Sequence, residues 1–205
     1  RKELVGAKLI ATPGCYVTAA TLALRPFVRG GIFHSQGLIV DAASGVSGAG
    51  KALKSSSMFT TVDEDFSAYG LVSHRHTPEM EQEIGGQVLF TPHLAPMNRG
   101  ILATCYARPI SVNTTTESLL QVLAEAYKNE KFVVVSEEIP STKSTQGTNA
   151  VHITARYDAR TGYAIVISAL DNLTKGASGG AVQSANVALG LNESSGLSAV
   201  GVWPC

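Results

Sequence analysis

The chain has 205 residues, of which 44% are hydrophobic and 16% charged, a composition typical of a globular protein with enough apolar side chains for a substantial core. Sixteen basic residues balance sixteen acidic ones, and no basic stripe occurs, which argues against nucleic acid or an anionic membrane surface as a partner. The sequence contains neither a signal peptide nor a long apolar stretch, so we expect no membrane span.

Taken in chain order, short apolar or alternating runs predict strands, and longer runs with helical periodicity predict helices. The predicted strands cover 8–11, 37–42, 87–90, 101–108, 132–135, 150–157 and 163–170. The predicted helices cover 15–24, 78–84, 117–129 and 179–189. Few helices combined with many strands predict an α+β layer structure.

Local signals refine three of these boundaries. The polar turn 158–162 ends in glycine and predicts that the last two strands form an antiparallel hairpin. Thr114 and Glu117 have the spacing of a capping signal at the start of the third helix. Residues 136–148 are polar and contain a proline and a glycine, so we expect a surface loop there.

The three cysteines are widely spaced and have the spacing of neither a disulfide framework nor a metal site, so we expect no bound metal. This usage fits a reducing compartment, and we expect a cytoplasmic location, or an organelle in a eukaryotic source. Cys105 lies in an apolar run and is expected to pack in the core. Cys205 is the last residue, where we expect fraying.

The third cysteine, Cys15, follows Pro13 and Gly14, which predict a tight turn, and precedes an Ala- and Leu-rich helix. A thiol in the first turn of a helix faces backbone N–H groups with partial positive charge, which favours the thiolate. Two interpretations stay open for this string. Cys15 is either a catalytic nucleophile or a small apolar residue of the core.

A second cluster, His74, Arg75 and His76, lies just ahead of the helix that starts near Pro78, with Glu79 in its first turn. In an extended segment the two imidazoles point the same way. One of them can exchange a proton with a nearby thiolate while Glu79 orients the ring. The segment is also open to interpretation as a solvated polar loop, or as part of a metal site completed elsewhere.

Residues 44–51 are rich in Gly and Ser and follow a predicted strand. Backbone N–H groups in such a loop can approach a phosphate or a carboxylate. The spacing matches neither of the common nucleotide-binding motifs, so a flexible turn is an equally good interpretation.

Residues 171–183 combine the end of a strand, a polar turn and the start of a small-residue helix. Gly179, Gly180 and Ala181 permit the close approach of a flat ligand or of another backbone. Tight packing of this helix on a sheet explains them equally well.

Five motifs occur in order along the chain, namely Pro13-Gly14-Cys15-Tyr16-x-Thr18-Ala19, Ser44-Gly45-x-Ser47-Gly48-Ala49-Gly50, His74-Arg75-His76-x-Pro78-Glu79, Arg99-Gly100-Ile101 and Asp171-Asn172-Leu173-x-Lys175-Gly176. Over nearly its whole length the chain therefore resembles the C-terminal portion of the N-acetyl-γ-glutamyl-phosphate reductase family, NADPH-dependent enzymes of arginine biosynthesis. The cysteine and double-His motifs are the specific ones. The second and fifth motifs are shared with aspartate-semialdehyde dehydrogenases.

The resemblance implies the fold of the C-terminal domain of glyceraldehyde-3-phosphate dehydrogenase, a mixed, largely antiparallel sheet with helices packed on one face. Residues 1–205 are expected to form a catalytic and dimerisation domain. The helix at 178–190 is expected to pack on an N-terminal dinucleotide-binding domain that this chain lacks. We therefore expect this chain to be part of a longer reductase. The complete enzyme is expected to be a homodimer or homotetramer and to have neither nucleic-acid nor membrane partners. By itself the chain is expected to be inactive, because the missing domain binds most of the NADP.

The resemblance also implies the chemistry. The Cys15 thiolate is expected to attack an acyl phosphate, and NADPH then reduces the resulting thioester to N-acetylglutamate 5-semialdehyde. His76 is expected to serve as acid and base with Glu79 orienting it, and His74 is the less favoured candidate. The remaining expected contacts are Arg75 and Arg99 to the substrate carboxylate, and Ser47, Gly48 and Asn172 to the cofactor. The alternatives are an aspartate-semialdehyde dehydrogenase-type reductase, a cysteine hydrolase and a non-catalytic dimerisation module.

Overall fold

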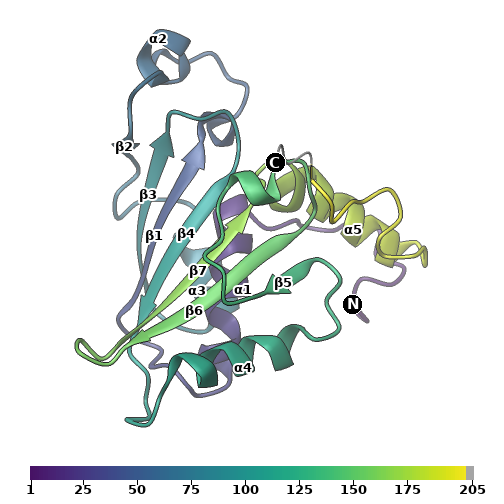
Figure 1. Cartoon of the computed structure of the whole chain (residues 1–205). Helices are drawn as coiled ribbons and strands as arrows, with labels where there is room; N and C mark the ends of the chain where they lie inside the picture. The colour runs from purple at the N-terminus through teal and green to yellow at the C-terminus, as the bar shows by residue number, and fades with distance from the viewer. Residues whose placement is uncertain (202–205) are drawn as a thin grey trace.

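Seven strands form one mixed sheet in the computed structural model, which describes residues 1–201 (Figure 1). The strands are β1 Leu38–Gly45, β2 Ser67–Ala68, β3 Val88–Ala95, β4 Ile101–Ala107, β5 Val133–Val135, β6 Val151–Asp158 and β7 Tyr163–Leu170. Their order across the sheet is β2-β3-β1-β4-β7-β6-β5. β1 and β3 pair parallel, as do β5 and β6, and the other neighbours are antiparallel. The expected mixed, largely antiparallel sheet is therefore confirmed. Cys205, for which fraying was expected, lies outside the described residues.

The predicted hairpin between β6 and β7 is present, with Asp158 paired to Tyr163 at its turn. The Asp158 carboxylate stabilises the turn, because it accepts hydrogen bonds from the Arg160 backbone N–H at 3.0 Å and the Thr161 hydroxyl at 2.7 Å. Gly162 closes the turn with a φ of 72°, in the left-handed region that favours glycine.

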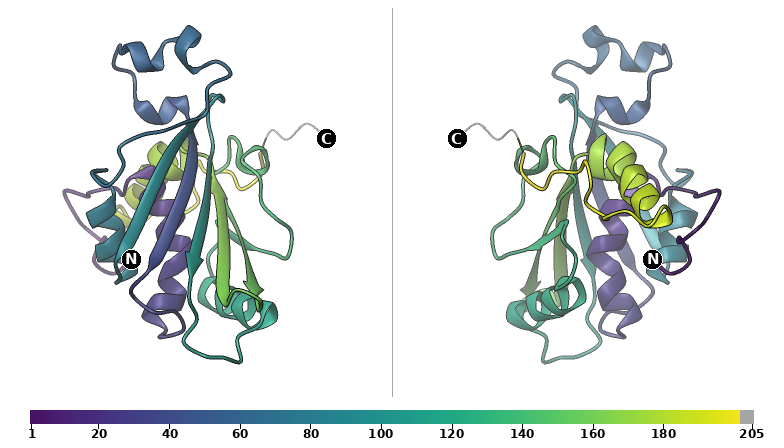
Figure 2. Two further views of the ribbon diagram at one scale, coloured as in Figure 1. Left: turned by 90° about the vertical axis from the view of Figure 1, so that its left-hand side faces the viewer. Right: turned by 90° about the vertical axis from the view of Figure 1, so that its right-hand side faces the viewer.

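The helices are α1 Cys15–Arg29, α2 Phe59–Val62, α3 Thr77–Ile84, α4 Thr116–Tyr127 and α5 Gly179–Ala188, with short single turns η1 Val46–Ala49, η2 Ser55–Ser57, η3 Lys143–Thr145 and η4 Thr174–Ser178. α1 packs on β4 and β7 and contacts both α3 and α4, so these three helices lie on one side of the sheet (Figures 1 and 2). The α+β architecture with helices on one face is therefore confirmed. Within residues 1–201, none of the helices has the length and apolar character needed to cross a bilayer.

Burial along β4 alternates as this arrangement requires. Ile101, Ala103 and Cys105 are buried under the helices, whereas Leu102 and Thr104 on the opposite face are only partly covered. The expectation that Cys105 packs in the core is confirmed, because its side chain has no exposed surface. The sheet therefore has one helix-covered face and one open face.

α1 continues five residues beyond its predicted end at Leu24 and includes Pro26. A proline has no N–H to donate to the carbonyl four residues earlier, here that of Leu22. The Tyr127 hydroxyl, from the last residue of α4, donates to this carbonyl oxygen at 2.6 Å instead. Side-chain compensation from a second helix thus lets α1 run to Arg29.

Three other expectations differ from the structure. The strand predicted at 8–11 is wrong, because these residues are irregular and the side chain of Leu9 is 93% exposed, so the apolar run buries little surface. The cap of α4 is Thr115 rather than Thr114, and it exchanges hydrogen bonds with Ser118. The loop 136–148 is only partly a surface loop, because Thr145 and Thr148 are buried.

The segment between β1 and β2 extends beyond the end of the sheet, at the top of Figure 1. It carries η1, η2 and α2 and exposes several large apolar side chains, including Leu53 and Phe59. We call residues 50–66 the arm.

Candidate functional site

The sheet register brings the predicted motifs to one end of the molecule. Ser44 near the end of β1 pairs with Ile101 at the start of β4, and Ile101 pairs with Leu170 at the end of β7. The Gly/Ser loop follows β1, the turn that begins at Asp171 follows β7, and α1 packs on β4 and β7. Segments more than 100 residues apart in the sequence therefore meet here, as their order in the sheet requires.

Cys15 is the first residue of α1, and its side chain is half-buried. The backbone N–H groups of Cys15 and Tyr16 and the charge of Arg75 lower the thiol pKa, as expected at a helix start. Burial raises it by more, so the net pKa of the thiol lies above its ordinary value. The expectation of a resting thiolate, based on the helix start alone, is thus corrected, because the sequence does not show the desolvation.

The His76 imidazole packs directly on the turn before Cys15. A Cβ atom placed on Gly14 would lie 2.3 Å from His76 Nε2, so only glycine leaves room for the ring. Burial, His74 and Arg75 together lower the pKa of His76 to about 4, which keeps the ring neutral at pH 7. His76 Nδ1 is buried and has no hydrogen-bond partner among the described residues.

His74 lies beside His76, with ring centroids 4.8 Å apart. Its Nδ1 accepts a hydrogen bond from the His76 backbone N–H at 3.1 Å, which fixes the orientation of the ring. Burial and the charge of Arg75 also lower the pKa of His74. Both imidazoles make edge-to-face contacts with the ring of Tyr16, the residue that follows Cys15.

Glu79 contacts the backbone rather than an imidazole. Its Oε1 accepts a hydrogen bond from the Gly14 N–H at 3.3 Å, which ties the start of α3 to the turn before Cys15. Among the described residues no hydrogen bond joins Glu79 to His74 or His76. The structure therefore brings Glu79 to the site, but in contact with the turn instead of with the ring that it was expected to orient.

The two arginines have different surroundings. Arg75 is exposed, its charge acts on the thiol and both imidazoles, and no carboxylate of residues 1–201 lies within ion-pair distance of it. Arg99 Nη2 forms an ion pair with Asp171 Oδ2 at 2.7 Å. Asp171 is fully buried, whereas 27% of the Arg99 side chain is exposed.

The three residues expected near the cofactor form a second cluster. Asn172 Nδ2 donates to Ser47 Oγ at 3.0 Å, and Asn172 Oδ1 accepts from the Gly100 N–H at 2.7 Å. A Cβ atom on Gly48 would lie 2.6 Å from Ser44 Oγ, so the loop packs closely on the end of β1. Ser47, Gly48 and Asn172 are therefore brought together by the fold.

Sequence reasoning missed the residue that packs on the nucleophile candidate. A Cβ atom on Gly176 would lie 2.8 Å from Cys15 Cβ and 3.3 Å from Cys15 Cα. The glycines singled out from the sequence have another role, since Gly179 packs against the Asn149 side chain. Gly176 is the last residue of the fifth sequence motif, but no local pattern in the sequence shows that it packs against Cys15.

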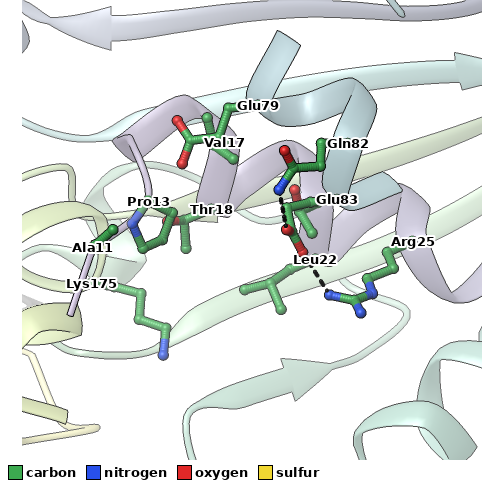
Figure 3. Close-up of a pocket in the computed structure, with 11 residues that line it drawn as sticks. Ala11, Pro13, Val17, Thr18, Leu22, Arg25, Glu79, Gln82, Glu83 and Lys175 are labelled. Atoms are coloured by element: carbon green, nitrogen blue, oxygen red, sulfur yellow. Dashed lines mark hydrogen bonds and ion pairs between the residues drawn. The ribbon is translucent and has the colours of Figure 1, made fainter. Parts of the chain in front are cut away.

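A pocket of about 500 Å³ flanks the site on the outer side of α1 (Figure 3). Apolar side chains of α1 line it together with Glu79 from α3 and Lys175 from η4. Arg25 and Glu83 form an ion pair of 3.0 Å at its edge. Pro13 and Glu79 are the link between this pocket and the Cys15 turn, while Cys15 itself lies outside the lining.

The sequence comparisons with known proteins indicate the family of the chain. Residues 15–172 match the family model described as semialdehyde dehydrogenase, dimerisation domain. The chain is 46% identical to N-acetyl-gamma-glutamyl-phosphate reductase of Pelobacter propionicus and 47% identical to that of Geobacter sulfurreducens, in both cases over 100% of the chain and 61% of the relative. An aspartate semialdehyde dehydrogenase II crystal structure from Vibrio cholerae matches 87% of the chain and 61% of that protein, with a TM-score of 0.69 and 15% identity. That structure supports the fold alone.

Proposed function

The chain belongs to the semialdehyde dehydrogenase dimerisation-domain family, and from that premise we propose that it is the thiol-bearing portion of an N-acetyl-γ-glutamyl-phosphate reductase. The reaction reduces the acyl phosphate with NADPH to N-acetylglutamate 5-semialdehyde and phosphate. The observation that carries the proposal is the placement of the His76 ring on the turn that precedes Cys15. The chain spans 61% of the length of these relatives, so a further domain is part of the proposal.

In the first step the sulfur of Cys15 attacks the acyl carbon of the substrate. The new C–S bond forms as the bond to the phosphate oxygen breaks, which gives a thioester and free phosphate. The thiol has to lose its proton for this step, because its pKa is raised. Neutral His76 is the proposed acceptor of that proton, and the exposed charge of Arg75 favours the thiolate that results.

NADPH, when bound, supplies the hydride that converts the thioester to the aldehyde level. In this chain Ser47, Gly48 and Asn172 are the residues proposed to contact NADPH. The Asn172 amide fixes the Ser47 hydroxyl at the edge of a loop whose glycines Gly48 and Gly50 are exposed. We assign most of the cofactor contacts to the additional domain. As the aldehyde leaves, His76 returns its proton to the sulfur of Cys15, and the backbone N–H groups of Cys15 and Tyr16 stabilise negative charge at this position.

We propose Arg75 as the residue that binds the substrate carboxylate. Its guanidinium is exposed near the Cys15 thiol, and within residues 1–201 it forms no ion pair with a carboxylate. A guanidinium in that position binds a carboxylate through two parallel hydrogen bonds. Arg99, the other arginine expected at the carboxylate, forms its ion pair with Asp171 instead, so we do not assign it to the substrate.

We also propose that two copies of the chain associate through the open face of the sheet. Leu89 on this face is 57% exposed, and Leu102 and Ile165 are only partly covered. Apolar side chains that no helix covers favour burial against a second copy, and the family description names a dimerisation domain. A homodimer or homotetramer in the cytoplasm is the corresponding expectation for the complete enzyme.

The test uses the full-length protein that carries this chain together with its dinucleotide-binding domain. N-acetylglutamate 5-semialdehyde, inorganic phosphate and NADP are mixed with the enzyme, and NADPH formation is followed by absorbance. We expect a phosphate-dependent rate that Cys15→Ser abolishes and that aspartate semialdehyde does not support. Equal rates with aspartate semialdehyde would favour the shorter substrate. A rate without phosphate dependence would contradict the proposed reaction.

A further inference from the structure

The feature that carries a further inference is the fully buried carboxylate of Asp171, at the end of β7. Three donors surround it. Oδ2 accepts from the Gly147 N–H at 2.7 Å and is paired with Arg99 Nη2 at 2.7 Å, and Oδ1 accepts from the Leu173 N–H at 2.9 Å. A buried carboxylate is tolerated only when its oxygens are satisfied in this way. Arg99 supplies the only positive charge within ion-pair distance of Asp171 among the described residues.

The backbone of Asp171 leads directly to the thiol. The Asp171 carbonyl accepts a hydrogen bond from the Gly176 N–H at 3.0 Å, which closes the turn 171–176. Gly176 then packs on Cys15, since a Cβ atom placed on it would lie 2.8 Å from Cys15 Cβ. The position of the Asp171 turn therefore determines how closely the chain packs against the first residue of α1.

The backbone on either side of Arg99 leads to the Gly/Ser loop. The Gly45 N–H donates to the Gly100 carbonyl at 2.9 Å, and the Ser47 N–H donates to the Asn98 carbonyl at 3.1 Å. The side chain of Asn172, the residue after Asp171, forms hydrogen bonds with both Ser47 and Gly100. Two adjacent pairs, Arg99 with Asp171 and Gly100 with Asn172, thus join the segment before β4 to the turn, and the Asn172–Ser47 bond joins the Gly/Ser loop to it.

We propose that Arg99 and Asp171 are positioning residues that hold the Ser47 loop and the Cys15 turn in a fixed relative geometry. The Arg99–Asp171 ion pair is the one charged contact among these neutral hydrogen bonds. It joins the segment just before β4 to the residue that follows β7. Its effect on the reaction is exerted through Ser47, Asn172 and Cys15 rather than through contact with the substrate. This inference rests on the proposed function for its kinetic consequences, whereas its effect on Cys15 is independent of that function.

The kinetic test compares Arg99→Met and Asp171→Asn in the full-length enzyme with the wild type, at saturating NADP and phosphate. Because small displacements of reacting groups are costly, we expect kcat to fall about 10- to 100-fold, with KM for N-acetylglutamate 5-semialdehyde within about threefold of the wild type. Arg99→Lys retains the charge and is expected to keep kcat within about threefold of the wild type. Arg160→Met is the matched control, because Arg160 forms an exposed ion pair with Asp158 in the β6–β7 hairpin.

The double variant R99M/D171N separates positioning from two independent roles. If the pair acts as one unit, the double variant loses about as much kcat as the worse single variant. Additive losses would contradict the inference. A KM increase of about tenfold or more in Arg99→Met, with kcat unchanged, would assign Arg99 to the substrate and overturn it.

A second measurement needs no cofactor and no substrate. The alkylation rate of Cys15 by iodoacetamide is measured on this chain by mass spectrometry of the Cys15 peptide, at constant pH. We expect Arg99→Met and Asp171→Asn to change this rate by more than about threefold relative to Arg160→Met, because the surroundings of the thiol move. Rates equal to that of the control would overturn the inference.

The two measurements also separate its failure from failure of the proposed function. If the wild-type enzyme gives no phosphate-dependent NADPH, the proposed reaction is wrong, and the alkylation rates still decide whether the pair positions Cys15. Circular dichroism checks that each variant folds. If Arg99→Met does not fold, Arg99→Lys and Asp171→Asn carry both comparisons.

Discussion

The Tyr127 hydroxyl donates a hydrogen bond of 2.6 Å to the carbonyl oxygen of Leu22, in the place of the N–H that Pro26 lacks. The bond joins α1 to α4 on the covered face of the sheet. Burial raises the pKa of Tyr127, so the hydroxyl keeps its proton at physiological pH and remains a donor. The last turn of α1 therefore depends on a side chain from another helix.

Replacing Tyr127 by Phe leaves the Leu22 carbonyl without this donor. Because an unsatisfied, partly buried acceptor is costly, we expect the free energy of unfolding to fall by about 1–2 kcal/mol. Urea unfolding of this chain, followed by circular dichroism, measures the change. Tyr163→Phe removes a hydroxyl at the start of β7 and is expected to stay within about 0.5 kcal/mol of the wild type. Equal losses in the two variants would contradict the role assigned to Tyr127.

Replacing Gly176 by Ala places a methyl group 2.8 Å from Cys15 Cβ, so the turn and the start of α1 have to separate. We expect a stability loss of about 1–3 kcal/mol from overpacking and a kcat loss of about 100-fold in the full-length enzyme. Thermal unfolding and steady-state kinetics measure the two effects. Ala177→Ser alters the exposed neighbouring residue and serves as the control. Wild-type kcat in Gly176→Ala would show that the close contact is dispensable.

The pH dependence of Cys15 alkylation reports the state of the thiol. Because burial raises its pKa, we expect the midpoint of the rate profile to lie above that of free cysteine, about 8.5. Arg75→Gln removes a positive charge that favours the thiolate, so it should move the midpoint further up. Arg160→Gln, on the distant hairpin, should leave it in place. A wild-type midpoint below 8.5, the rough value for free cysteine, would mean that the helix start outweighs burial.

His76 makes the stability of the fold depend on pH. Its pKa is about 4 in the folded chain and about 6.5 in the unfolded chain, so as pH falls through this window the unfolded state binds a proton that the folded state does not. The contribution of neutral His76 is therefore complete above about pH 6.5 and is lost towards pH 4. Because the ring is only half-buried, solvent screening keeps the effect small.

Urea unfolding at about pH 7 and about pH 4.5 measures this dependence. We expect the difference in unfolding free energy between the two pH values to be smaller in His76→Gln than in the wild type. His34→Gln removes an exposed imidazole and serves as the control. A pH dependence identical in the wild type and in His76→Gln would show that protonation of this ring is not coupled to folding.

The sequence is most informative where local chemistry determines structure. The 158–162 turn predicts the β6–β7 hairpin because the bonds that close it lie within the turn itself. Pro13 and Gly14 likewise predict the start of α1 at Cys15. The end of α1 could not be predicted in this way, because it depends on a hydroxyl 105 residues away.

The candidate site follows the same division. Ser47 and Asn172 lie together, as the motifs imply, but the Cys15 thiol has a raised pKa because of burial that no local pattern reveals. Arg99 pairs with Asp171, and Glu79 bonds to the backbone of Gly14, so both form contacts that were not predicted. Side-chain partners from distant segments are determined by the packing of the sheet and helices, and only the fold specifies them.

The arm also has a consequence for how the chain can be divided. β1 lies between β3 and β4, so the piece before the arm and the piece after it share two strand interfaces. Leu53, within the arm, is fully exposed and accessible to a protease. A single cut there should give a nicked molecule whose halves remain associated, with Cys15 on one fragment and both active-site histidine candidates on the other. The proposed proton exchange would then take place between two polypeptides.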